Sequence, residues 1–180
     1  MIFREVEDRD LILRARQGDV DAYNILVSRW EKRVYNYLLQ TLRDREDALD
    51  LCQETFLKAY RALGRLEEVD RFPQWIFRIA RNEAVSLYRR NRFRAEDEDV
   101  EAASDVMAAA VPSGRLELTL AVQAALERLK PEQREVVVLK VYQGFKFHEI
   151  AEILDSPVST IKSRLYSALE ALKVTLAPVG

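Results

Sequence analysis

The stretch that decides the fold is residues 148–165, HEIAEILDSPVSTIKSRL. Its first half predicts a short helix, His148–Leu154, because apolar residues recur there at helical spacing. Asp155 follows at the point where such a turn needs a left-handed backbone, which aspartate tolerates better than most residues. Ser156 is then expected to be the N-cap of a second helix, and Pro157 is expected to be its first residue. The stretch as a whole predicts a helix-turn-helix.

The second helix of this pair has a polar outer face opposite its apolar stripe. The outward residues of its first two turns are Ser159, Thr160, Lys162, Ser163, Arg164 and Tyr166. Hydroxyls and cations at a helix start are suited to bonding phosphates and to reaching base edges in the major groove. The alternative is a solvated face in a helical bundle. We favour DNA binding, because the cap, the spacing and the polar face occur together.

The chain before this pair also has helical periodicity. It predicts a short helix around Asp10–Gln17 and three long helices, over residues 19–42, over residues 44–64 with Asp44 as the N-cap, and from Pro73 onward. The third long helix is expected to bury Ile76, Ile79, Ala80, Val85 and Tyr88. The β-branched run at 135–142 could form a strand, but Pro131 and the helical neighbours favour a helix. The sequence therefore predicts an all-α protein.

The net charge of −2 conceals an uneven distribution. Residues 1–94 carry 19 basic and 16 acidic side chains. Residues 95–117 carry one basic and seven acidic side chains, and residues 118–180 carry eight basic and seven acidic ones. The acidic middle predicts a flexible, self-repelling linker. An ordinary surface loop is the alternative, although more than about 15 residues is long for one. We predict two small helical domains, 1–94 and 118–180, joined by an acidic flexible linker at 95–117.

A second nucleic-acid signal lies in residues 71–94, which hold seven arginines and a single acid, Glu83. The aromatics interleaved with them are Phe72, Trp75, Phe77, Tyr88 and Phe93. Arginines contact phosphates, and exposed aromatics stack on unpaired bases. Core packing is the alternative for the aromatics, and we favour it for Phe72 and Phe77. The helix around residues 46–63 has an acidic face instead, which would repel DNA and which we assign to a protein partner.

Several classes of protein are excluded by what the sequence contains. A single cysteine rules out a disulfide framework, and one histidine, His148, rules out a zinc-protease helix. There is no glycine-rich phosphate loop, no apolar run of about 20 residues, and the charged N-terminus is unlike a signal peptide. We expect a cytoplasmic protein that is not an enzyme and has no metal, cofactor or small-molecule substrate.

Three stretches together resemble the extracytoplasmic-function (ECF) sigma factors, promoter-specificity subunits of bacterial RNA polymerase. Residues 47–60, DALDLCQETFLKAY, are similar to the family's core-binding helix. Residues 72–82, FPQWIFRIARN, with Arg89 and Arg90, are similar to its promoter-melting and minus-ten helix. Residues 129–134, 149–154 and 157–165 are similar to its minus-thirty-five module.

The resemblance implies a role for each group of residues. Those facing the clamp helices of the polymerase would be Asp47, Asp50, Gln53 and Glu54. Those holding the opened minus-ten element, where a base is flipped into a pocket, would be Trp75, Arg78, Arg81, Asn82, Arg89 and Arg90. Those reading the minus-thirty-five element would be Ser159, Thr160, Lys162, Ser163 and Arg164. Core RNA polymerase, promoter DNA and an anti-sigma factor are the implied partners, and the linker would thread toward the polymerase active site.

The chain departs from the family pattern at a few positions. Leu49 and Ser86 stand where acids are usual. Ser167 and Leu169 stand where basic residues are usual, and the smaller number of phosphate contacts predicts weaker minus-thirty-five binding. The competing interpretation is a conventional helix-turn-helix regulator with an N-terminal sensor or dimerisation domain. A protein that only sequesters a partner is a third. The arginine–aromatic helix argues against the conventional regulator. Two separate DNA-binding signatures argue against a protein that only sequesters a partner.

Overall fold

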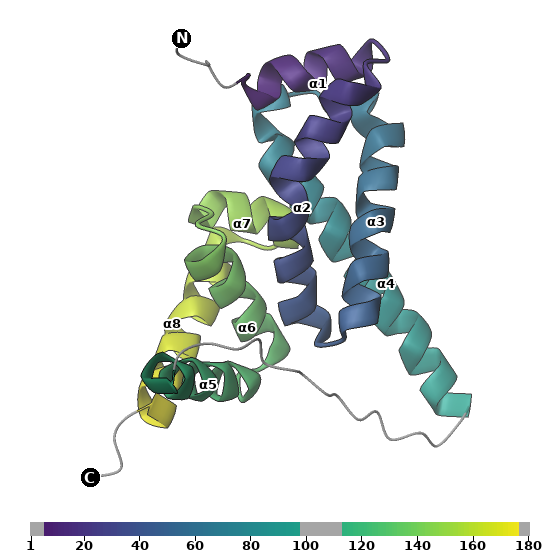
Figure 1. The fold of residues 1–180 in the computed structure, drawn as a ribbon. Coiled ribbons are helices and arrows are strands. Elements are labelled where there is room, and N and C mark those ends of the chain that lie inside the picture. Colours follow the sequence, from purple (N-terminus) through teal and green to yellow (C-terminus); the bar gives the residue numbers. More distant parts are fainter. Residues whose placement is uncertain (1–5, 98–112, 177–180) are drawn as a thin grey trace. The chain divides into compact units, whose positions relative to one another are not determined.

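The computed structural model describes residues 6–97 and 113–176, and every regular element within them is helical. The chain divides into two compact units, residues 1–103 and 104–180 (Figure 1). The predicted all-α, two-domain architecture is confirmed. None of the helices in the described ranges is long and apolar enough to cross a membrane.

The first unit is a bundle of four helices, α1 (Asp8–Arg16), α2 (Val20–Leu42), α3 (Arg45–Ala62) and α4 (Phe72–Asp97). Aspartates fix where two of them begin. The Asp19 carboxylate accepts a hydrogen bond from the Ala22 N–H at 3.0 Å, and Asp44 accepts one from Asp47 at 2.8 Å. Asp44 was predicted as an N-cap, and this is confirmed. Two short 3₁₀ turns, Leu63–Arg65 and Val69–Arg71, connect α3 to α4.

The core of this unit is aromatic where α2 meets α4. Tyr37 and Phe77 are fully buried with ring centroids 5.4 Å apart, and Phe72 is fully buried against Trp30 at 6.0 Å. Burial of Phe72 and Phe77 was predicted, and this is confirmed. The two rings fix the N-terminal half of α4 against the bundle.

The predicted buried stripe of α4 is wrong at its C-terminal end. Ile76 and Ala80 are buried, Ile79 and Val85 are half-buried, and Tyr88 is 67% exposed. Figure 1 shows the reason, since the C-terminal half of α4 extends past the ends of α2 and α3. Within residues 6–97 no helix is left for that end of α4 to pack against, so helical periodicity alone overestimated the buried length of α4.

The second unit contains α5 (Ser113–Glu127), α6 (Pro131–Val137), α7 (Phe147–Leu154) and α8 (Val158–Leu176). A π-helical turn, Val138–Tyr142, extends α6, so the β-branched run at 135–142 is helical as predicted. Its strand-like composition reflects burial, because all of residues 136–139 lie in the core. They pack with the apolar stripes of α7 and α8, formed by Ile150, Ile153, Leu154, Ile161, Leu165 and Ala168.

The predicted linker lies mostly outside the described residues. Helix α4 continues to Asp97 and α5 begins at Ser113, so helices extend into both ends of the 95–117 span. Residues 98–112, with most of the acidic side chains of that span, lie outside the described ranges.

Candidate nucleic-acid and polymerase interfaces

The residues predicted to hold the minus-ten element lie on α4, and most of them are accessible. Arg78, Asn82, Arg89 and Arg90 are exposed, while Trp75 and Arg81 are half-buried. Arg78, Asn82 and Arg89 are spaced by four and seven residues, which puts them on one face of the helix. Helix α4 therefore has a basic, solvent-facing side along most of its length.

Trp75 and Arg81 are held more closely by the bundle than the other four. The Trp75 ring packs on the buried Phe72 ring at a centroid distance of 6.0 Å. The Arg81 Nε is buried and has no hydrogen-bond partner among the described residues. An unpaired buried donor is costly, so Arg81 has hydrogen-bonding capacity that an incoming acceptor could satisfy.

Two exposed aromatics near the C-terminal end of α4 were absent from the predicted site. Tyr88 is 67% exposed and Phe93 70% exposed, next to the arginines at 89, 90, 92 and 94. A flat, exposed ring beside cations is suited to stacking on unpaired bases. The signal in the sequence was their placement among arginines, but only the length of α2 and α3 shows that they are not core residues.

The residues predicted to bind core polymerase lie on α3. Asp50 and Gln53 are exposed, and Asp47 and Glu54 are half-buried. Partial burial raises the pKa of the Asp47 carboxyl above its ordinary value, and the neighbouring carboxylates of Asp44, Asp50 and Glu46 raise it further. This end of α3 therefore holds a concentration of negative charge.

An ion pair connects this acidic helix to α4. The Lys58 ammonium lies 2.7 Å from the Glu83 carboxylate of α4, whose side chain is only 14% exposed, and 3.8 Å from Glu54. Glu54 is thus partly neutralised within the bundle. Asp50 has no such cation among the described residues, which makes it the more available carboxylate.

A shallow pocket of about 360 Å³ lies between α2 and α3 beside these acids. Its lining includes Leu49, Cys52 and Gln53 from α3, and Glu31, Lys32 and Tyr35 from α2. Cys52 is buried, and burial raises the pKa of its thiol to about 11, so the side chain acts as a small apolar residue rather than a nucleophile. Within residues 6–97 and 113–176 no cluster of three metal-ligating side chains occurs.

The helix-turn-helix geometry predicted for the C-terminal unit is present, with one correction. Asp155 has φ 48° and ψ 53°, the left-handed conformation expected of it. Helix α8 begins at Val158 rather than Pro157, and the Ser156 hydroxyl donates to the Leu154 carbonyl at 3.2 Å. Ser156 therefore bonds back to α7 and does not open α8 as predicted.

The residues predicted to read the minus-thirty-five element lie on the first two turns of α8. Ser159, Lys162 and Ser163 are exposed, and Thr160 and Arg164 are half-buried. On the opposite side Ile161 is fully buried and Leu165 nearly so. The polar face of α8 is thus separated from its apolar face as a groove-reading helix requires.

The two units match different parts of one protein family. The family model for Sigma-70 region 2 matches residues 26–94, and that for Sigma-70 region 4 matches residues 119–172. The RNA polymerase sigma-H factor of Pseudomonas aeruginosa is 30% identical over 96% of this chain and 95% of its own length. The ECF RNA polymerase sigma-E factor of Escherichia coli K12 is 31% identical over 97% of each chain.

Solved structures show the same similarity. The sigma factor RpoE from Bartonella quintana, in complex with the anti-sigma factor NepR, matches with a TM-score of 0.78 and 26% identity over 88% of this chain and 98% of its own. CnrH in complex with the cytosolic domain of CnrY matches with a TM-score of 0.71 and 28% identity, over 96% of this chain and 99% of its own. The chain therefore belongs to the family of ECF RNA polymerase sigma factors.

Proposed function

We propose that the chain is a promoter-specificity subunit that binds core RNA polymerase, recognises minus-thirty-five and minus-ten elements, and promotes DNA melting. The observation that carries this proposal is the arginine-rich α4 with its exposed aromatics. A sensor or dimerisation domain has no use for such a helix, whereas strand opening needs both phosphate contacts and a stacking surface. Like the family, it is a transcription initiation factor rather than an enzyme, and it acts in the cytoplasm.

We assign the work of each domain from the surfaces described above. Residues 1–94 would bind the polymerase through Asp47, Asp50, Gln53 and Glu54, and the minus-ten element through Trp75, Arg78, Arg81, Asn82, Arg89 and Arg90. Residues 118–180 would bind the minus-thirty-five duplex through Ser159, Thr160, Lys162, Ser163 and Arg164. Residues 95–117 would connect the two while both are engaged on the promoter.

An anti-sigma factor is the regulatory partner that we expect. The sigma factor RpoE has been solved in complex with the anti-sigma factor NepR, and CnrH, the other structural match, in complex with the cytosolic domain of CnrY. A partner that covered α3 or α4 would block polymerase or DNA, and would thereby hold the chain inactive.

Run-off transcription tests the proposal. Bacterial core polymerase and a promoter library would be incubated with and without the full chain, and transcripts that appear only with the chain are expected. A chain that binds duplex DNA tightly alone, yet neither joins core polymerase nor starts transcripts, would be a conventional regulator and would refute the proposal.

A further inference from the structure

Two lysine ammonium groups converge on one aromatic ring in the C-terminal unit. The Lys140 Nζ lies 4.8 Å from the centroid of the Phe147 ring, and the Lys162 Nζ lies 5.6 Å from the same centroid. Lys140 belongs to the π-helical turn after α6, Phe147 opens α7, and Lys162 lies on α8. Three elements therefore bring two cations to within about 10.4 Å of each other.

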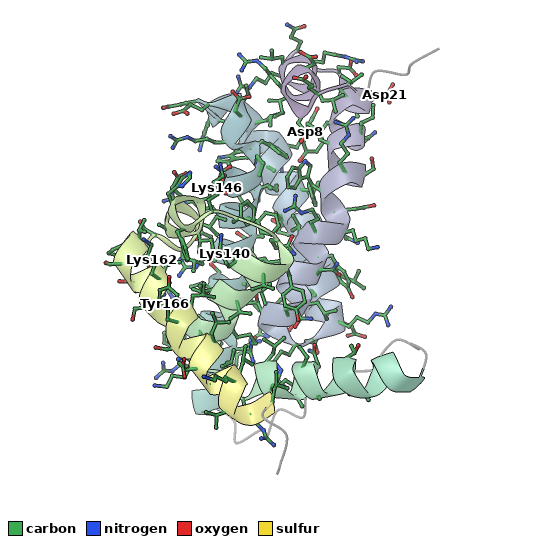
Figure 2. All side chains as sticks on the ribbon, turned by 90° about the vertical axis from the view of Figure 1, so that its left-hand side faces the viewer. Asp8, Asp21, Lys140, Lys146, Lys162 and Tyr166 are labelled. Carbon is green, nitrogen blue, oxygen red and sulfur yellow. The ribbon has the colours of Figure 1, made fainter. Side chains whose placement is uncertain are left out.

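A third lysine, Lys146, directly precedes Phe147 in the chain. The Lys140 ammonium also donates to the Phe145 carbonyl at 3.1 Å, and the next residue is Lys146. Lys146 is the N-cap of α7 and its side chain makes no capping hydrogen bond. Figure 2 shows Lys140, Lys146 and Lys162 on the same side of this unit. We refer to these three residues as the lysine cluster.

The charge of the cluster is not neutralised inside the unit. Among residues 113–176 none of the three lysines forms an ion pair. The nearby Glu149 carboxylate accepts a hydrogen bond from the Lys146 backbone N–H at 2.6 Å, so it is directed to the start of α7. That bond also occupies an N–H that could otherwise have bound an anion, which leaves the ammonium groups as the donors.

The ring gives the cluster some order. A cation over an aromatic face is attracted by the ring quadrupole, so Phe147 restrains two flexible side chains that would otherwise spread apart by repulsion. Ammonium groups that are held in place and have no counter-ion are available to bind an anion. Lysine is a compact point charge and a common phosphate ligand.

We propose that the lysine cluster binds a backbone phosphate of duplex promoter DNA, with Phe147 as the positioning residue. This rests on the proposed function, because α8 must lie against the duplex for its neighbour to receive a phosphate. Phosphate is favoured over a carboxylate of a protein because Lys162 also belongs to the polar face of α8, between the exposed hydroxyls of Ser159 and Ser163. Neither Lys140 nor Lys146 was among the residues predicted from sequence.

The salt dependence of DNA binding tests the contact, with a matched control in the same unit. Lys130 is the N-cap of α6, its backbone N–H donates to Gln133 at 3.3 Å, and its side chain makes no capping hydrogen bond. Lys146→Ser and Lys130→Ser therefore make the same chemical change at equivalent helix positions. We expect Lys146→Ser to reduce the slope of log K against log salt by about 0.9, and Lys130→Ser to leave it unchanged.

A second variant separates positioning from contact. Phe147→Leu keeps all three charges but removes the ring, so we expect weaker binding with an unchanged salt slope, and Phe147→Tyr is expected to restore affinity. Thermal unfolding of each variant, followed by circular dichroism, establishes that the unit remains folded. A Phe147→Leu variant that is folded and binds as tightly as the wild type would overturn the positioning role.

The outcomes distinguish this proposal from the proposed function. An unchanged slope for Lys146→Ser, with run-off transcription intact, would overturn the lysine cluster and leave the proposed function standing. An unchanged slope together with weaker binding of an acidic protein would assign the cluster to that protein and would also overturn the proposal. A wild-type chain that starts no transcripts would refute the proposed function, while the slope of its own duplex binding would still decide on the cluster.

Discussion

Replacing Phe93 by alanine separates recognition of unpaired DNA from recognition of duplex. The Phe93 side chain is 70% exposed, so the substitution should change the free energy of unfolding by no more than about 0.5 kcal/mol. Stacking on a base is worth about 1–3 kcal/mol per aromatic. Since about 1.4 kcal/mol is a factor of ten, Phe93→Ala should weaken binding to opened DNA roughly 5- to 150-fold.

The assay compares two promoter fragments bound by polymerase that contains the full chain. One is a complete duplex, and the other has a single-stranded non-template strand at the minus-ten element. Phe93→Ala should lose affinity for the second fragment and change duplex binding by less than about twofold.

Tyr166→Ala is the matched control, because that ring is 59% exposed but lies on α8 in the other unit. Tyr166→Ala should leave unchanged the difference in affinity between the duplex fragment and the fragment with the single-stranded minus-ten element. Equal losses on both fragments for Phe93→Ala, or no loss on the single-stranded one, would refute the stacking role of α4.

Other surfaces and the core give three further expectations. The double variant Ser167→Arg, Leu169→Arg should bind the minus-thirty-five duplex more tightly, because both positions are exposed on α8. Each new phosphate contact should steepen the salt slope by up to about 0.9. Anisotropy titrations that show neither change would contradict this expectation. Asp50→Arg should weaken core polymerase binding about tenfold or more without altering the thermal unfolding of the chain, and unaltered binding in a gel-shift titration would remove Asp50 from that interface. Ile161→Ala should destabilise the second unit by about 2–5 kcal/mol because Ile161 is fully buried, and a loss well under 1 kcal/mol in denaturant unfolding would show that it contributes little to the core.

The features that could be predicted from sequence are those that neighbouring residues determine. Asp44 was recognisable as an N-cap because capping is a bond to a backbone N–H a few residues away. Asp155 was recognisable as the turn residue because few L-amino acids tolerate its left-handed backbone. The spacing of apolar residues fixed the type of nearly every helix, including the β-branched run at 135–142.

The features that could not be predicted depend on where separate elements meet. Tyr88 follows helical spacing, yet it is exposed because α2 and α3 end before α4 does. Lys140 and Lys162 are far apart in the chain, and only the packing of α6 and α8 around α7 brings both to Phe147. Ser156 satisfied every local rule for opening α8, but its hydroxyl bonds back to Leu154 instead.

The left-handed residue at the turn between α7 and α8 has a thermodynamic consequence for DNA binding. With Asp155 at φ 48° and the stripe Ile161, Leu165 and Ala168 buried, α8 is held in place before any DNA arrives. Ordering a residue on binding costs about 1–2 kcal/mol of backbone entropy, and α8 has already lost that freedom during folding. Binding of the duplex by its polar face therefore requires no further ordering of the α8 backbone, and this part of the entropic cost of recognition falls on folding instead.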